Sequence, residues 1–202
     1  MYELGFNYNK DYTVFNLFPP EINNVKLLLY ENYDDVRYTS IDMKKVGEYF
    51  EVKVEGNLDG VYYKYQIDDK YEIVDPFCKA CSINSLKSCV VDLQSTNPKG
   101  FQDEKYEVSN RNDAIIYELS VKDFSSDSSS EVQENLRGKF LGLVSDNDVS
   151  GINHLKDLRI THVHLMPVFD FVGVDERNSE NYAQDNYNWG YNPENYNCIE
   201  GS

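Results

Sequence analysis

The sequence predicts a small antiparallel β-sandwich of the immunoglobulin-like kind, followed by a βαβ unit. Residues 1 to about 100 contain short β-rich runs at regular spacing, separated by turn residues. From about residue 113 the order changes to strand, loop, helix and strand. Hydrophobic residues make up 41% of the 202 residues, enough for a core. We expect a first domain over residues 1–108 and a second over 109–202.

Strands of the first domain are predicted from runs rich in aromatic and β-branched residues. The runs are residues 12–18, 25–30, 49–54 and 61–67. Bends or turns fall between them at Pro19-Pro20, Gly56-Asn57 and Asp68-Asp69. In the third run, alternation places Val52 and Val54 on one buried face and the charged residues on the other. This pattern is typical of the half-buried strands of a sandwich.

The second domain begins with a near-continuous apolar run at residues 114–121. Such a run favours a parallel strand that is covered on both faces. Residues 122–150 are then predicted to be loop-like, because the serine-rich stretch 125–130 is too polar to pack.

A short helix and a second strand complete the βαβ unit. Ser150 is predicted to cap a helix that places Ile152, Leu155 and Leu158 on one side at helical spacing. The next apolar run, residues 160–167, is the second strand. A barrel or a doubly wound sheet begins with this order of elements.

The charge balance narrows the choice of partners. There are 35 acidic against 19 basic residues, a net charge of −16, which repels phosphate backbones and anionic lipid surfaces. Nucleic acid and membrane partners are therefore not expected, whereas neutral polysaccharides are compatible with the charge. An acidic balance more often means only a solvated surface. No secretory signal or apolar membrane span is visible, so we expect a cytoplasmic protein.

Four cysteines raise the question of a metal or redox site. Cys78 and Cys81 form a CxxC motif, while Cys89 and Cys198 stand apart. A zinc site would need a second pair or nearby histidines, and a redox motif would need a thioredoxin-like βαβ setting. Neither accompanies the motif. We therefore expect reduced thiols, and neither a metal nor another cofactor.

An aromatic cluster stands near the C-terminal end of the sequence. Residues 187–193 read Tyr-Asn-Trp-Gly-Tyr-Asn-Pro and contain the single tryptophan of the chain. Aromatic faces set among amide groups suit the apolar faces and hydroxyl rims of sugar rings. The cluster is therefore a candidate sugar-binding loop.

Four segments of the second domain carry a resemblance in their order along the chain: residues 116–125, 138–143, 160–171 and 187–193. Together they resemble the start of the catalytic barrel of type I pullulanases, debranching enzymes of the α-amylase superfamily in glycoside hydrolase family 13. The last segment resembles a tyrosine-asparagine-tryptophan-glycine-tyrosine-aspartate-proline signature, with Asn192 in place of the aspartate. This resemblance implies that residues 109–202 form strands 1 and 2 of an incomplete TIM (β/α)8 barrel.

The first domain resembles the family 48 carbohydrate-binding module that precedes such barrels. Residues 15–30 resemble its opening strands, and residues 74–77 and 89–101 resemble the lead-in to the barrel. Departures from the pattern are Phe18 in place of a tryptophan in the module, and Ser120 and Lys122 in place of a histidine and an arginine in the first barrel strand.

The resemblance also implies a reaction and a substrate. It implies hydrolysis of α-1,6-glucosidic linkages, with pullulan, glycogen or starch dextrins as the α-glucan partner. Tyr191 is similar in position to the tyrosine that stacks beneath the sugar next to the cleaved bond. Tyr187 and Asn192 are weaker candidates for the same pocket. Trp189 either lines this pocket or anchors the loop in the protein interior.

Catalytic residues are not expected in this chain. Retaining glycoside hydrolysis uses two carboxyl groups about 5 to 5.5 Å apart, and the resemblance implies that these lie on barrel strands four, five and seven. We therefore expect a truncated chain that is inactive alone. Asp170 follows a barrel-type strand, but loop carboxylates in an acidic chain are more often turn formers or solvated charges. His162 and His164 share one strand face, and packed or pocket-lining roles are favoured because no third metal ligand is in sight.

Two further interpretations stay open. The chain could act as a noncatalytic α-glucan-binding module that uses aromatic residues of the sandwich. Alternatively, the sandwich could be a structural element that braces a barrel and binds no sugar.

Overall fold

A computed structural model describes residues 3–103, 110–178 and 186–201, and it divides into two compact units. The sandwich unit comprises Met1–Lys99, Phe169–Asn188 and Asn192–Ser202, and the parallel-strand unit comprises Gly100–Val168 and Trp189–Tyr191. The boundary predicted between residues 108 and 109 lies outside the described residues, so the division at that point stays a prediction. By its contacts, most of the chain after residue 168 groups with the sandwich.

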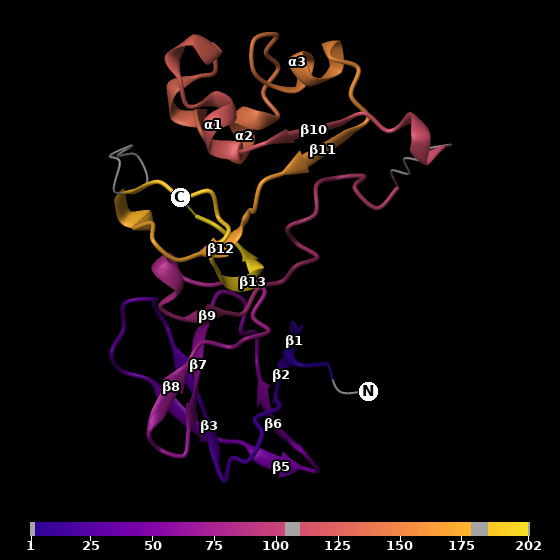
Figure 1. Cartoon of the computed structure of the whole chain (residues 1–202). Helices are drawn as coiled ribbons and strands as arrows, with labels where there is room; N and C mark the ends of the chain where they lie inside the picture. Colours follow the sequence, from indigo (N-terminus) through magenta and orange to yellow (C-terminus); the bar gives the residue numbers. More distant parts are fainter. Residues whose placement is uncertain (1–2, 104–109, 179–185, 202) are drawn as a thin grey trace. The chain divides into compact units, whose positions relative to one another are not determined.

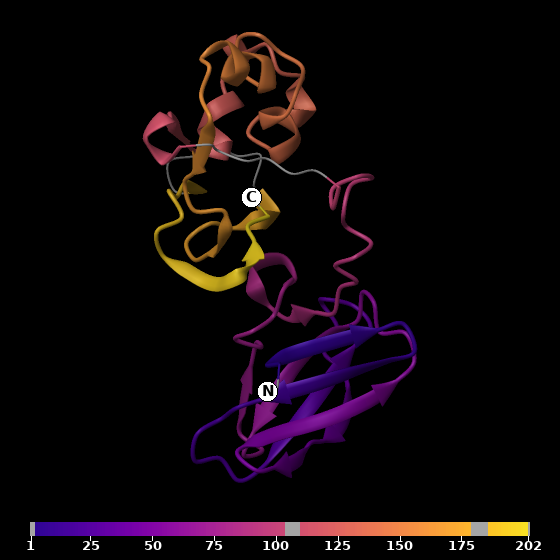
Figure 2. The ribbon, with the colours of Figure 1, turned by 90° about the vertical axis from the view of Figure 1, so that its right-hand side faces the viewer.

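Two antiparallel sheets form the sandwich (Figure 1 and Figure 2). In spatial order, the first sheet contains β1 (Gly5–Asn9), β2 (Tyr12–Leu17), β6 (Tyr49–Glu55) and β5 (Lys44–Val46). The second contains β4 (Thr39–Asp42), β3 (Val25–Tyr30), β7 (Tyr62–Ile67) and β8 (Tyr71–Ile73), with β9 (Ser88–Cys89) also paired to β7. The predicted β-sandwich is confirmed, and each predicted run contains a strand that agrees within one residue at each end.

Side chains from both sheets meet in one apolar core. Its buried members are Phe6, Phe15, Leu17, Val25, Leu27, Met43, Phe50, Tyr63, Tyr65 and Val90. The ring of Tyr63 packs edge-on against Phe15 at 5.0 Å and Tyr65 at 5.7 Å, an arrangement that aromatic quadrupoles favour. Val52 and Val54 are partly buried against this core, as the alternation in β6 predicts.

Asp75 allows two tyrosine hydroxyls to be buried in this core. The hydroxyls of Tyr63 and Tyr65 donate to Asp75 Oδ2 at 2.7 and 3.3 Å, and the Phe77 N–H donates to Asp75 Oδ1 at 2.8 Å. The Asp75 N–H in turn donates to Ser88 Oγ at 2.8 Å. Burial raises the pKa of Asp75, and its hydrogen bonds oppose that shift. This network satisfies every group named and ties the core to β9.

A further antiparallel pair belongs to the sandwich unit: β12 (Phe169–Phe171) and β13 (Pro193–Ile199). Residues 160–171 were expected to be one segment around a single strand. They instead form β11 (His162–Leu165) and β12, interrupted at residues 166–168. Pro167 has no N–H to donate to a strand ladder, which explains the break.

The parallel-strand unit contains the predicted strand, helix and strand (Figure 1), but residues 122–150, expected to be loop-like, also contain short helices. β10 (Ile116–Leu119) pairs in parallel with β11, and the chain between them forms α1 (Val121–Ser125), α2 (Phe140–Leu143) and α3 (Ile152–Asp157). The expected cover on both faces of β10 is wrong for this structure. Ile116 is 65% exposed, because in the described residues this sheet has only two strands.

Single 3-10 turns occur in both units, as η1 (Ile83–Ser85), η2 (Arg111–Asp113), η3 (Ser128–Ser130), η4 (Glu134–Leu136) and η5 (Glu176–Asn178). Within the described ranges, every helix is too short or too polar to cross a lipid bilayer.

Both ends of the serine-rich stretch 125–130 are buried, contrary to the prediction, whereas residues 127–129 are exposed. The buried Ser125 hydroxyl accepts the Gly138 N–H at 2.9 Å. The buried Ser130 hydroxyl donates to the Ser125 carbonyl at 3.0 Å and accepts the Val132 N–H at 3.3 Å. Serine hydroxyls can thus satisfy the backbone of tight turns, and polar composition does not exclude packing.

Ser150 does not cap α3, as had been predicted. The N-cap residue is Gly151, and the Ser150 hydroxyl instead donates to the Phe124 carbonyl. Of the predicted helix face, Leu155 is buried, whereas Leu158 lies at the C-cap and is exposed. Ser150 thus lies one residue before the N-cap position and makes a tertiary contact that the neighbouring sequence does not indicate.

The Asp75 network makes a prediction about stability. Replacing Asp75 with alanine (Asp75→Ala) leaves two buried hydroxyls and one amide without their acceptor, and should lower the free energy of unfolding by about 3 kcal/mol. Urea denaturation of the full chain measures this change. The exposed Asp103→Ala variant is the control and should change stability by less than about 0.5 kcal/mol. Equal effects of the two substitutions would contradict the assigned role.

Candidate functional site

The aromatic loop predicted to bind sugar lies at the surface. Tyr191 is 64% exposed, Trp189 is 60% exposed, and Tyr187 is also exposed. The interpretation of Trp189 as an interior anchor is therefore wrong for this structure. Gly190, between the two rings, has φ of 86°, a left-handed conformation that a side chain would strain. The glycine allows the chain to turn between Trp189 and Tyr191.

Hydrogen bonds fix both sides of this loop. The Asn192 and Asn188 side-chain amides donate to the Val172 carbonyl at 2.8 and 2.9 Å. A carboxylate at position 192 would be an acceptor only and could not make this bond, so the asparagine suits this loop better than the aspartate of the signature. The Tyr191 hydroxyl donates to Glu118 Oε1 at 3.5 Å.

The four predicted sugar-binding residues are divided between the units. Tyr187 and Asn192 belong to the sandwich unit, and Trp189 and Tyr191 belong to the parallel-strand unit. Their assignment to one substrate pocket stays a prediction.

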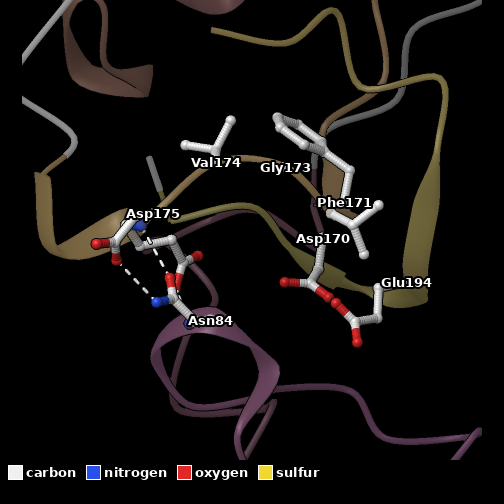
Figure 3. Close-up of a pocket in the computed structure, with 9 residues that line it drawn as sticks. Asn84, Asp170, Phe171, Gly173, Val174, Asp175 and Glu194 are labelled. Atoms are coloured by element: carbon white, nitrogen blue, oxygen red, sulfur yellow. Dashed lines mark hydrogen bonds between the residues drawn. The ribbon is translucent and has the colours of Figure 1, made fainter. Parts of the chain in front are cut away.

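A cavity that was not predicted from the sequence lies within the sandwich unit (Figure 3). This cavity of about 220 Å³ is bounded by η1, β12, the chain up to η5, and β13. Its polar lining residues are Asn84, Asp170, Asp175, Glu176 and Glu194. Four of these five are carboxylates, so the cavity is strongly acidic.

Asp170 is held by buried amide and hydroxyl groups. It is 3% exposed, and its Oδ2 accepts from Asn195 Nδ2 at 2.8 Å and from Ser85 Oγ. Asn195 Nδ2 also lies 2.8 Å from Ser85 Oγ. Figure 3 shows the Asp170 and Glu194 carboxylates next to each other. Burial, and then the charge of Asp170, raises the pKa of Glu194. The contacts of Asp170 are those of a structural carboxylate.

Asn84 holds the opposite side of the cavity. Its Nδ2 donates to Asp175 Oδ1 at 2.8 Å, and its Oδ1 accepts the Glu176 N–H at 2.8 Å. Dashed lines in Figure 3 mark hydrogen bonds between Asn84 and the segment that contains Asp175. The hydrogen bond from Asn84 is the main cause that lowers the pKa of Asp175. These hydrogen bonds hold the segment around η5 against η1.

Metal-ligating side chains gather in one place in the described part of the chain. Oxygen atoms of Asp170, Glu176 and Glu200 lie within 4.8 Å of one another, and no other group of three or more metal-ligating side chains among the described residues is as close. Each accepts hydrogen bonds from protein groups: Glu176 from the Gly201 N–H at 2.9 Å, and Glu200 from the Phe171 N–H at 3.1 Å. These donors account for the cluster without a cation.

The two histidines of β11 are exposed instead of packed. His162 Nδ1 lies 2.8 Å from Thr161 Oγ1. The packed role for His162 and His164 is therefore wrong in this structure, and the pocket-lining role stays a prediction.

An aromatic surface on the second sheet was missed by the sequence analysis. We call Tyr30, Tyr33, Tyr38 and Tyr62 the tyrosine platform. Tyr30 and Tyr62 are opposite each other on β3 and β7, and alternation directs them away from the core that Tyr63 enters. Tyr38 packs on Tyr30 at 5.6 Å, and Tyr33 packs on Tyr62 at 6.4 Å.

A lysine completes the platform. Lys87 Nζ lies 4.6 Å from the centroid of the Tyr30 ring and donates to the Tyr33 carbonyl. Burial lowers the pKa of Lys87 and raises that of Tyr30 to about 12. Tyr33 and Tyr38 keep exposed faces, whereas Lys87 is 7% exposed, so the platform offers aromatic surface that a buried lysine supports.

Comparison with known proteins identifies the family. Residues 3–78 match the model of carbohydrate-binding module 48, the isoamylase N-terminal domain. The pullulanase of Bacillus subtilis (strain 168) is 34% identical over 213 residues, which cover 99% of this chain and 28% of that relative. The chain corresponds to an N-terminal portion of pullulanases that includes this module. The predicted family and its carbohydrate-binding module are confirmed.

Solved pullulanase structures agree with this family. Pullulanase from Bacillus acidopullulyticus matches 98% of this chain and 25% of its own, with a TM-score of 0.88 and 37% identity. A pullulanase variant from Paenibacillus barengoltzii, complexed with maltotetraose, matches 100% of this chain and 32% of its own, with a TM-score of 0.91 and 34% identity. The chain thus spans about a quarter to a third of these pullulanases.

The buried Asp170 network makes a second prediction. Asn195→Ala removes the amide donor to Asp170 and Ser85 from a buried site, and should lower the free energy of unfolding by about 2 kcal/mol. Thermal and urea unfolding measure this loss. Asn197→Ala, at an exposed position on the same strand, is the matched control and should be nearly neutral. A neutral Asn195 variant would show that the network is dispensable.

Proposed function

We propose that the chain is the N-terminal portion of a pullulanase-type enzyme that hydrolyses α-1,6-glucosidic linkages in pullulan, glycogen or starch dextrins. The observation that carries this proposal is the similarity to pullulanases along nearly the whole chain. The family 48 module at residues 3–78 supports it, since carbohydrate-binding modules deliver enzymes to polysaccharides.

The parallel pairing of β10 and β11 supports a further part of the proposal: residues 109–202 supply strands 1 and 2 of a TIM (β/α)8 barrel. A barrel of this kind has eight parallel strands and typically about 250 residues. Exposed apolar side chains on both strands, including Ile116 and Val163, are the surface that neighbouring strands and helices of a barrel would cover.

The proposed role of Tyr191 is to hold a sugar ring by its apolar face at the subsite next to the cleaved bond. Its exposed ring supports this role. Trp189 and Tyr187 add aromatic surface to the same loop. Asn192 contributes by holding the loop through Val172.

Hydrolysis is not expected from residues 1–202 alone. Full-length chain incubated with pullulan should release no more reducing sugar than a buffer blank, because the resemblance implies that the catalytic carboxylates lie on barrel strands four, five and seven, and this chain is proposed to supply only strands 1 and 2. Asp170→Ala is the control: it is the most buried carboxylate of the acidic cavity. If the wild-type chain releases sugar and Asp170→Ala does not, the prediction of an inactive chain is wrong and catalysis belongs to this cavity.

A second function, α-glucan binding by the sandwich, is favoured by the tyrosine platform. Its rings are held in place by mutual packing, so little conformational entropy is lost when a sugar stacks on Tyr33 or Tyr38. Lys87 supplies a buried cation that orders the platform. The maltotetraose complex of the Paenibacillus barengoltzii variant is consistent with an α-glucan as the ligand class.

Native gel electrophoresis in the presence of glycogen tests the platform. Wild-type chain should be retarded, and Tyr33→Ala should weaken the apparent affinity by roughly fivefold, since one stacked ring contributes about 1 kcal/mol. Tyr196→Ala, which removes a more exposed tyrosine from β13, is the control and should leave mobility unchanged. Unretarded wild-type chain would instead favour a structural sandwich that binds no sugar.

A further inference from the structure

The four cysteines, scattered along the sequence, gather in the sandwich unit as free thiols. Cys198 on β13 lies 120 residues from Cys78, yet their sulfur atoms are 3.2 Å apart. The neighbouring Cys78 and Cys81 thiols raise the pKa of the Cys198 thiol, so Cys81 also lies near Cys198. The CxxC motif therefore has a third thiol that sequence spacing does not show.

Cys78 and Cys198 are held in position by the structure around them. The Cys78 N–H donates to the Asp75 carbonyl at 3.0 Å, so the turn that carries Cys78 starts from the buried carboxylate network. Cys198 donates through its thiol to the Cys78 carbonyl at 3.6 Å, and Cys78 donates to Asn195 Oδ1 at 3.7 Å. A disulfide bond is about 2.05 Å long, so the sulfurs need to approach by only about 1 Å.

We propose that Cys78 and Cys198 form a reversible disulfide that cross-links β13 to the sandwich, with a low-molecular-weight disulfide such as oxidised glutathione as the oxidant. A protein thiolate attacks one glutathione sulfur, the glutathione disulfide breaks, and one glutathione leaves as thiolate and takes up a proton. The second protein thiolate then attacks the protein sulfur of the mixed disulfide and expels the other glutathione. The two cysteines lose two electrons and two protons, and two glutathione thiols are formed.

The first thiol to react is Cys81. Cys78 and Cys198 are buried, whereas Cys81 is only half-buried and lies near Cys198. The Cys198 thiolate attacks the glutathione sulfur of the mixed disulfide at Cys81, takes over the glutathionyl group and releases the Cys81 thiolate. The Cys78 thiolate then attacks the Cys198 sulfur, forms the Cys78–Cys198 disulfide and expels the second glutathione. The neighbouring Cys78 and Cys81 thiols, and then burial, raise the pKa of Cys198. Since the thiolate is the nucleophile, the exchange is slow at neutral pH and faster at higher pH.

The cross-link would close a long loop of the chain. Cys78 and Cys198 are separated by 120 positions, so the bond restricts the unfolded chain strongly and the oxidised form unfolds at a higher temperature. It also fixes β13, which carries Glu194 of the acidic cavity.

Peptide mapping tests the proposal directly, because trypsin places each cysteine on its own peptide: residues 71–79, 80–87, 88–99 and 178–202. The full chain is equilibrated in glutathione buffers with an increasing oxidised share, free thiols are blocked with N-ethylmaleimide, and the digest is analysed by mass spectrometry. We expect a cross-link between peptides 71–79 and 178–202 that dithiothreitol removes. The proposal would be overturned if no cross-link formed at the highest oxidised share, or if every cross-link involved peptide 80–87 or peptide 88–99.

Three variants make the test specific. Cys89→Ser should keep the cross-link, Cys81→Ser should keep it but slow its formation severalfold, and Cys198→Ser should lose it. Oxidation should raise the Tm of the wild type by several degrees and leave the Tm of Cys198→Ser unchanged. A wild-type Tm that does not rise while the cross-link forms would contradict a bond between two parts of the folded sandwich unit.

Discussion

The buried carboxylate of Asp75 is the interaction on which much of the sandwich unit depends. It accepts from the two core tyrosines of β7 and from the backbone at Phe77, and its own N–H reaches β9. The turn that follows must pass close to β1: a Cβ on Gly5 would lie 2.9 Å from the Phe77 carbonyl oxygen, so that position tolerates only glycine. The same turn then places Cys78 and leads to η1.

From η1 onward, polar contacts replace apolar packing as the means of joining distant segments. Asn84 and Ser85 bind side chains or backbone groups that are 85 to 110 residues away. These bonds hold β12, β13 and the chain near η5, and they enclose an acidic cavity in which Asp170, Asp175 and Glu176 accept hydrogen bonds from protein donors. An acidic chain can bury such groups because amides and hydroxyls stabilise their charge.

The two surfaces proposed to bind sugar are held in shape by different interactions. The tyrosine platform is rigid, because its rings pack on one another and on Lys87 above a complete core. The aromatic loop owes its shape to Gly190 and to the amides that bind Val172. The sandwich has a closed core, whereas β10 and β11 expose apolar faces. This contrast fits a family in which the matched region is about a quarter to a third of each solved relative.

Local pattern was sufficient for β2, β3, β6 and β7, for the order of strand, helix and strand, and for the family, because alternation, turn residues and short motifs are properties of neighbouring residues. It failed wherever a contact joins residues far apart. Nothing near Cys198 in the sequence indicates Cys78, and nothing near Ser150 indicates Phe124. The packed serines, the pairing of β12 with β13 and the acidic cavity likewise depend on long-range hydrogen bonds, whose partners are chosen by the folded chain and not by the residues beside them.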